Sequence, residues 1–151
     1  MKAATLAITA LLIASPAYAN VGESQAAIEK RYGKGFDEKI VDDHQTRRSY
    51  SSQGLKIIVT FIDGVSQAET YGKQSDSQLS ESEITKLLDE NGRGEKWIQV
   101  KDADVKDKMW KLPDEVIVAG YNESDKKLHV FTRVLTEFHK KKKAEGAEKP
   151  K

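Results

Sequence analysis

Residues 55–71 read LKIIVTFIDGVSQAETY, and this stretch decides the fold. In a strand, the side chains of its first eight residues would point alternately to two sides. One side would then be wholly apolar and half of the residues on the other side would be apolar, which is typical of a strand in a packed sheet. Asp63-Gly64 offers the two positive-φ positions of a type I′ turn, and the chain then returns over residues 65–71. The stretch therefore predicts a β-hairpin. Residues 45–52, with a turn at Gln53-Gly54, predict a further strand before it.

A helix with clear start and stop signals follows a linker of small polar residues at 74–78. Ser80 and Glu83 have the spacing of a capping box, and apolar residues at 79 and 84 occupy the positions of a hydrophobic staple. Apolar residues at 84, 87 and 88 supply the buried stripe, and Asn91-Gly92 ends the helix.

The remaining pattern gives the order of the elements. A first helix is predicted over residues 22–32, with Gly33 as its left-handed C-terminal cap. Short strands are predicted at 97–100, 109–112, 116–121 and 128–135, followed by a short helical turn at 136–143. We therefore expect an α+β fold in which a unit of one helix and antiparallel strands occurs about twice. The strands would form a meander sheet with the helices packed on one face.

The N-terminus has the pattern of an export signal. A lysine at position 2 precedes an uncharged run from Ala3 to Ala14, and Ala17-Tyr18-Ala19 fits a small-x-small cleavage site. The run has roughly 12 residues, whereas a membrane-spanning helix needs about 20, so we expect no transmembrane anchor. Asn20 follows the cleavage site in place of the cysteine that a lipoprotein requires. The sequence thus predicts a signal peptide at 1–19 and a periplasmic or secreted protein.

Removal of residues 1–19 from the 151-residue chain leaves 132, enough for a single domain with its own core. Residues 20–139 carry 18 basic and 22 acidic side chains, and this mildly acidic balance argues against a nucleic-acid-binding body, which would show a basic face. Residues 140–151 contain six lysines, two glutamates and no large apolar side chain, which predicts a disordered Lys-rich tail. The domain would then span 20–139, with possible sub-units at 20–73 and 79–139.

Signatures of catalysis are missing from the sequence. The chain has no cysteine, three histidines and no Gly-x-Ser-x-Gly nucleophile elbow. Asp42-Asp43-His44 offers metal-ligand atoms, but adjacent residues on an extended segment point to opposite sides, so a solvated loop is the better interpretation. His129 alternates with Leu128 and Val130 and is expected to face away from them. We predict neither an enzyme nor a cofactor.

Two features indicate contact with a partner. Trp97, Trp110 and Tyr121 are partner-binding candidates because buried aromatic residues anchor many interfaces, although all three also suit a core with few large side chains. The lysine run is the second feature, since lysines attract anionic head groups or polymers, although a merely solubilising tail has the same composition. The lysines of this run are Lys140, Lys141, Lys142 and Lys143.

A resemblance to a known group rests on the first predicted helix, where Gly22-Glu23-Ser24 is followed by Ile28 and Tyr32-Gly33. This pattern before a meander sheet resembles small bacterial periplasmic proteins of the SmpA/OmlA and β-lactamase-inhibitor-protein-like type. The resemblance implies a non-catalytic protein that acts by protein–protein contact. The chain departs from the group in lacking the lipoprotein cysteine and in having Lys34, not proline, after Gly33.

From the sequence we therefore expect a non-catalytic exported interaction module whose partner is another envelope or secreted protein. One alternative is a binder of anionic polymers or lipid head groups that acts through the Lys-rich tail. Another is a small hydrolase-like enzyme.

Overall fold

The computed structural model describes residues 21–101 and 107–147. The predicted signal peptide, with Ala17, Ala19 and Asn20, and the last four residues of the predicted tail lie outside this part of the chain. The described elements are, in order, α1 (Gln25–Tyr32), β1 (Phe36–Ile40), β2 (Gln45–Ser52), β3 (Leu55–Ile62), β4 (Val65–Lys73), α2 (Glu81–Asn91), β5 (Ile98–Val100), β6 (Lys108–Lys111), β7 (Ile117–Asn122), β8 (Lys127–Thr132) and α3 (Arg133–Ala147).

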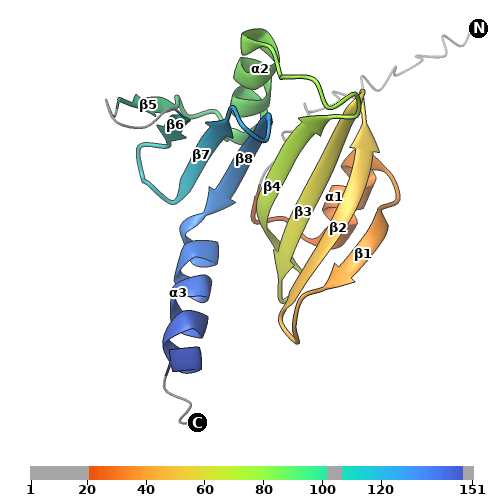
Figure 1. Ribbon diagram of the computed structural model, residues 1–151, viewed down its shortest axis with the longest axis vertical. Helices are drawn as coiled ribbons and strands as arrows, with labels where there is room; N and C mark the ends of the chain where they lie inside the picture. Colours follow the sequence, from red (N-terminus) through yellow and green to blue (C-terminus); the bar gives the residue numbers. More distant parts are fainter. Residues whose placement is uncertain (1–20, 102–106, 148–151) are drawn as a thin grey trace, which may run out of the picture.

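The eight strands form one antiparallel sheet in the order β1-β2-β3-β4-β8-β7-β6-β5. Each half of the sheet is a helix followed by a four-stranded meander, and the halves join where β4 pairs with β8. Figure 1 shows the two halves side by side, with α1 behind β2 and β3 and with α2 at the end of the sheet opposite to α3. This arrangement confirms the α+β fold with a twice-occurring unit.

The hairpin between β3 and β4 has the expected turn chemistry. Asp63 (φ 48°) and Gly64 (φ 78°) both occupy the left-handed region that a type I′ turn requires. The same geometry recurs at Gln53 (φ 49°) and Gly54 (φ 77°), between β2 and β3. The residues of these two turns therefore set the register in which β2, β3 and β4 pair.

The capping box of α2 is also confirmed. The Ser80 hydroxyl accepts a hydrogen bond from the Glu83 backbone N–H (3.3 Å), and the Glu83 carboxylate accepts one from the Ser80 N–H (2.7 Å). The first helix begins three residues later than predicted, because the Ser24 hydroxyl accepts from the Ala27 N–H and so caps α1. Gly33 ends α1, as predicted, with a positive φ of 86°, but its ψ of −173° lies outside the left-handed helical region that was expected.

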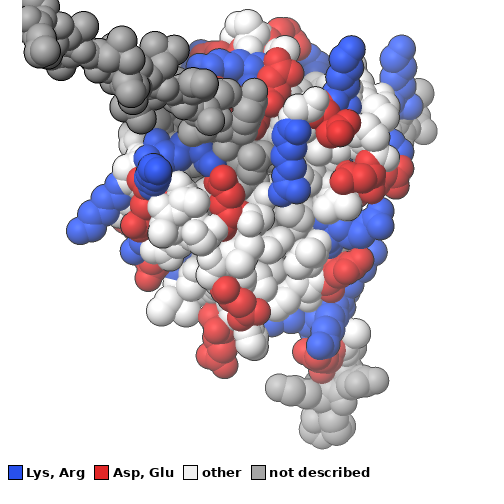
Figure 2. All heavy atoms as spheres, turned by 180° about the vertical axis from the view of Figure 1, so that it is seen from behind, with Lys and Arg blue, Asp and Glu red and all other residues white. Residues whose placement is uncertain are grey.

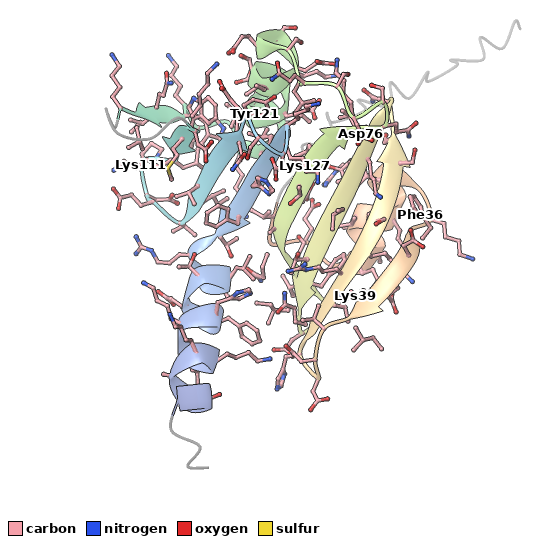
Figure 3. The ribbon with its side chains drawn as sticks, viewed as in Figure 1. Phe36, Lys39, Asp76, Lys111, Tyr121 and Lys127 are labelled. Atoms are coloured by element: carbon pink, nitrogen blue, oxygen red, sulfur yellow. The ribbon has the colours of Figure 1, made fainter. Side chains whose placement is uncertain are left out.

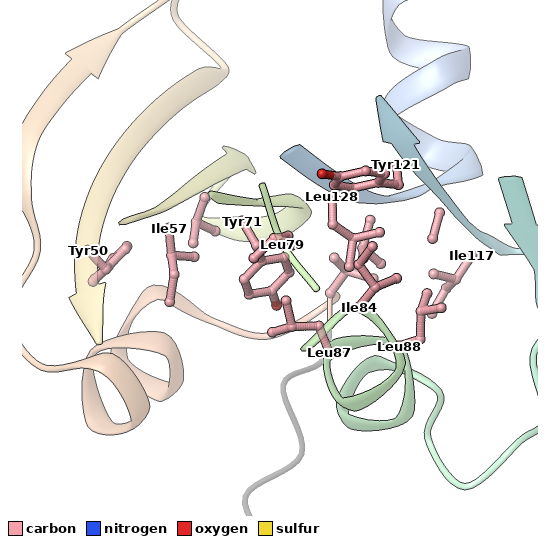
Figure 4. Packing of buried hydrophobic residues seen from close by; sticks show 14 of the residues in the cluster. Tyr50, Ile57, Tyr71, Leu79, Ile84, Leu87, Leu88, Ile117, Tyr121 and Leu128 are labelled. Carbon is pink, nitrogen blue, oxygen red and sulfur yellow. The ribbon is translucent and has the colours of Figure 1, made fainter. Parts of the chain in front are cut away.

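The core lies between the sheet and the first two helices. Alternate strand residues and the apolar stripes of α1 and α2 form one buried cluster on this side, which we call the helix-covered face. In Figure 4 the side chains of Leu87, Ile84 and Leu88 point from α2 toward Tyr71, Leu128 and Ile117 of the sheet, respectively. The opposite side of the sheet is called the open face.

The C-terminal region differs from the prediction. Strand β8 ends at Thr132, not at 135, because the Thr132 hydroxyl accepts from the Leu135 N–H (3.4 Å) and starts α3. Residues 140–147, predicted to be disordered, continue this helix. Alanine, lysine and glutamate all favour helix, so a segment without a core can extend a helix that is already nucleated. Strand β1, all of whose residues are exposed, had not been predicted.

Candidate functional site

The strand register places two rows of side chains across the open face. Directly opposed residues of antiparallel strands lie on the same face, so the printed pairs can be followed from β1 to β5. The first row is Phe36, Ser49, Ile58, Thr70, His129, Gly120, Met109 and Val100. The second row is Lys39, Arg47, Thr60, Ala68, Phe131, Val118, Lys111 and Ile98.

The composition of these rows is unusual for an exposed sheet surface. Neither row contains an aspartate or a glutamate, whereas the sequence as a whole has 24 of them. Small side chains, among them Ala68 and Gly120, occupy central positions, and large apolar residues occupy the β5–β6 end. Ile98, Val100 and Met109 at that end are 47%, 39% and 38% exposed. The two rows therefore form a carboxylate-free strip of the open face with an apolar end, and Glu115 beside Lys111 and Asp125 beside His129 lie at its margins.

Helix α3 converts part of this surface into a groove of about 720 Å³. We call it the basic groove. Its floor comes from β2, β3, β4 and β8, and its wall comes from α3. The side chains that line it are Arg47, Ile58, Thr60, Ala68, Thr70, Lys127, His129, Phe131, Leu135, Thr136, His139, Lys140 and Lys143. Figure 3 shows Lys127 at the start of β8, beside β4.

The charges of the basic groove are uncompensated. Within the described residues, none of Arg47, Lys127, Lys140 and Lys143 forms a salt bridge, and no carboxylate lines the groove. Elsewhere the charges are mixed, as Figure 2 shows for the side of the molecule turned away in Figure 1, where blue and red side chains alternate. Four cationic groups around a partly apolar floor favour a ligand that combines negative charge with apolar groups.

The four consecutive lysines at 140–143 make different contacts in the structure. Lys140 and Lys143 line the basic groove. Lys142 forms a salt bridge with Asp42, in the loop between β1 and β2, and its ammonium lies 5.1 Å from the centre of the Phe138 ring. Lys141 lies 3.9 Å from Glu145 on the same helix. The contact between Lys142 and Asp42 ties the far part of α3 to the first half of the sheet.

Two side chains that line the basic groove, Thr70 and His129, form a hydroxyl–imidazole–carboxylate series with Asp125, which lies outside the lining. Thr70 Oγ1 lies 3.1 Å from His129 Nδ1, and Asp125 Oδ2 lies 3.1 Å from His129 Nε2. Nucleophilic hydrolases use this order, but they also need backbone donors aimed at an oxyanion. Strands β4 and β8 are paired on both sides, so their N–H groups around Thr70 and His129 are engaged in the sheet. The two contacts fix the orientation of the His129 ring.

The polar groups of the helix-covered face, unlike those of the basic groove, are buried and hydrogen-bonded to one another. The Glu69 side chain is fully buried, and its Oε2 accepts hydrogen bonds from the hydroxyls of Tyr71 (2.5 Å) and Tyr32 (2.8 Å). Asn91 of α2 donates to the Tyr71 hydroxyl (3.0 Å), and Arg31 of α1 approaches Glu69 to 3.9 Å. Burial raises the pKa of Glu69, and the two tyrosine hydrogen bonds oppose this. The network joins both helices to β4.

The aromatic partner candidates lie on the helix-covered side of the sheet. Tyr121 is 4% exposed and belongs to the core. Trp97 and Trp110 are half-buried, pack against the core and line a separate groove of about 630 Å³. The structure thus brings Trp97 and Trp110 together and places Tyr121 within the core.

Two further properties can be stated for residues 21–101 and 107–147. No three His, Cys, Asp or Glu side chains in these ranges come together in a way that could hold a metal ion. No helix in the same ranges combines the length and apolar character needed to cross a membrane.

Sequence reasoning missed most of the basic groove. His129 was expected to face away from Leu128 and Val130, and it does. The pairing of Thr70 with His129 joins residues 59 positions apart, and no local signal specifies it. The available signal was the alternation along β3, β4 and β8, which leaves small and basic residues on the side opposite to the core.

Comparison with known proteins gives little similarity. No family model matches the chain. No curated protein matches it either. Among solved structures, it is similar to a cysteine-rich secretory protein from Staphylococcus aureus, with a TM-score of 0.47 and 10% identity, over 76% of this chain and 45% of that one. The chain therefore spans less than half the length of that protein, and the resemblance to the SmpA/OmlA and β-lactamase-inhibitor-protein-like group stays a prediction.

Proposed function

We propose that the protein is a non-catalytic exported binding module whose open face takes an acidic segment of a partner protein. One observation carries the proposal: four cationic side chains without salt-bridge partners among the described residues surround a floor that includes Ile58 and Phe131. An acidic segment with large apolar side chains would be complementary to both the charges and the floor.

The form of the basic groove favours a chain over a small molecule. It is open to solvent along the sheet, and the exposed apolar residues at the β5–β6 end extend the same face beyond it. A small ligand is usually enclosed on most of its surface, whereas a polypeptide can follow an open surface. The partner is expected to place carboxylates near Arg47 and Lys127 and apolar side chains over the sheet.

A peptide selection tests this function. Random displayed peptides are selected on the purified domain and counter-selected on the Arg47→Glu variant. Selected peptides are expected to combine Asp or Glu with large apolar residues and to bind the variant about tenfold more weakly, since reversal replaces attraction by repulsion. Their affinity should also fall as salt rises from 0.05 to 0.5 M. Selected peptides without acidic residues, or with equal affinity for the variant, would contradict the proposal.

The export part of the proposal has its own test. Ala17 and Ala19 fit the pockets of a signal peptidase, and the described chain enters the core at Val21, which is fully buried. Intact mass of the protein from the exported fraction should correspond to a chain that begins at Asn20. A product that retains residues 1–19, or one that carries a lipid, would refute this expectation.

A further inference from the structure

A second groove lies on the helix-covered side, between the last turns of α2 and strands β5 and β6. It has a volume of about 630 Å³ and is lined by Trp97 and Trp110. These are the only tryptophans of the chain. Gln99 is paired with Trp110 across β5 and β6, so the two side chains stand on the same face of the sheet. We call this site the tryptophan groove.

One indole of the tryptophan groove is rigidly placed. The Nε1–H of Trp97 donates to the carbonyl of Leu88 (2.6 Å), near the end of α2. An added Cβ at Gly92 would lie 3.0 Å from Trp97 Nε1 and 2.8 Å from the Glu95 carbonyl, so only glycine allows the ring this close approach. The indole is therefore held in one orientation before any ligand arrives, which lowers the entropy cost of binding.

The rim of the groove offers donors and acceptors in nearly equal measure. Asp89 and Glu95 supply carboxylate oxygens, Lys96 supplies an ammonium, and Gln99 can donate and accept. Within the described residues, neither these two carboxylates nor Lys96 takes part in a salt bridge. The flat indole rings thus lie beside polar groups that can form further hydrogen bonds.

We propose that the tryptophan groove binds a neutral oligosaccharide. A sugar ring has an apolar C–H face that can stack on an indole and hydroxyls at its edge that both donate and accept hydrogen bonds. The carboxylates of Asp89 and Glu95 disfavour an anionic ligand, and Lys96 disfavours a cationic one. A wholly apolar ligand would bury the polar groups of the rim without forming hydrogen bonds to them, which costs free energy.

NMR spectroscopy gives a direct test, because a ¹⁵N spectrum contains only two indole N–H signals, from Trp97 and Trp110. The folded domain is titrated with chitotetraose, cellotetraose, mannotetraose and maltotetraose. At least one of these probes should shift both indole signals and reach saturation in the millimolar range or below. If none of the four shifts either signal at 20 mM, the proposal is overturned.

Variants separate a real site from incidental contact. Gln99→Ala and Asp89→Ala change exposed groups, so the fold should persist, and each should weaken binding of the active probe at least fivefold. Lys111→Ala, on the other face of β6, is the matched control and should leave the affinity unchanged. Equal affinities for all three variants would overturn the proposal. Binding of acidic peptides to the open face is a separate property and should be the same in Gln99→Ala as in the wild type.

Discussion

Ile57 and Ile58 are adjacent in β3, yet they belong to different environments. Ile57 is 1% exposed and lies in the core under the helices, whereas Ile58 lines the basic groove on the open face. Around Ile57 the polar groups are buried and joined in the Glu69 network. Around Ile58 the charged groups are exposed and lack salt-bridge partners among the described residues.

The two faces differ in what they contribute to the fold. Residues of the helix-covered face form the core and fix both helices to the sheet, so they determine the free energy of unfolding. The residues of the open face contribute less to stability and leave apolar surface and positive charge unused by the fold. A surface of this kind is typical of a binding site.

The largest effect is expected from the isoleucine pair. Ile57→Ala should lower the free energy of unfolding by about 2–5 kcal/mol, because it removes buried carbon atoms and leaves a cavity. Ile58→Ala removes the same atoms from a half-buried position and should cost about 1 kcal/mol. Urea unfolding measures both values. Similar losses for the two variants would contradict the assignment of the faces.

The same pair should show the reverse order in binding. Ile58→Ala should weaken a peptide selected on the open face, while folded Ile57→Ala should bind it as the wild type does. Peptide titration below the unfolding transition measures this, and a loss confined to Ile57→Ala would place the binding site elsewhere.

A second prediction concerns the buried carboxylate of the helix-covered face. Burial raises the pKa of Glu69 above its ordinary value. Its protonation therefore stabilises the fold fully below about pH 4.3, the unfolded pKa, and this contribution is lost as the pH rises through the folded pKa. Relative to Glu69→Gln, the wild type should lose about 1.4 kcal/mol for each unit by which the pKa is raised.

Unfolding free energies at pH 4, 5, 6 and 7 measure this difference. The control is Glu137→Gln, the same substitution at an exposed position of α3, which should give a profile parallel to that of the wild type. If Glu69→Gln also gives a parallel profile, the carboxyl group is not coupled to folding as the structure implies.

The smallest effect is expected at the start of α2. Ser80→Ala removes the side-chain acceptor of the capping box and should cost about 1 kcal/mol. Hydrogen bonds from Ser80 and from Lys73 lower the pKa of Glu83 to about 2. Because this pKa is lowered, the stabilisation from the ionised capping carboxylate is present above about pH 4.3 and fades as the pH falls toward 2.

Ser77→Ala is the matched control, since Ser77 is exposed in the linker before the helix. The urea midpoint of Ser80→Ala should be lower than that of the wild type, by less at pH 3 than at pH 7. The midpoint of Ser77→Ala should equal that of the wild type at both pH values. Equal midpoints for the two serine variants would mean that the capping box does not contribute to stability.

Elements with local signals were predictable from the sequence, and the groove was not. Asp63-Gly64 and the Ser80–Glu83 box act over a few residues, and both are confirmed. Strand β1 gave no alternation and includes Asp37 at φ 49°, where the register shifts. The basic groove depends on the pairing of β4 with β8 and on α3, which is held partly by the distant contact between Lys142 and Asp42.

A matched pair of charge reversals tests the central claim, that the open face carries recognition, most directly. Lys127 lines the basic groove, and Lys30 is exposed on α1 beyond the other face. Lys127→Glu and Lys30→Glu change the net charge of the protein equally. The affinity for a selected acidic peptide and the thermal midpoint are measured for both. Lys127→Glu should weaken binding about tenfold with little change in midpoint, and Lys30→Glu should change neither appreciably. Equal losses of affinity in the two variants would contradict the account, because net charge and not the groove would then govern binding.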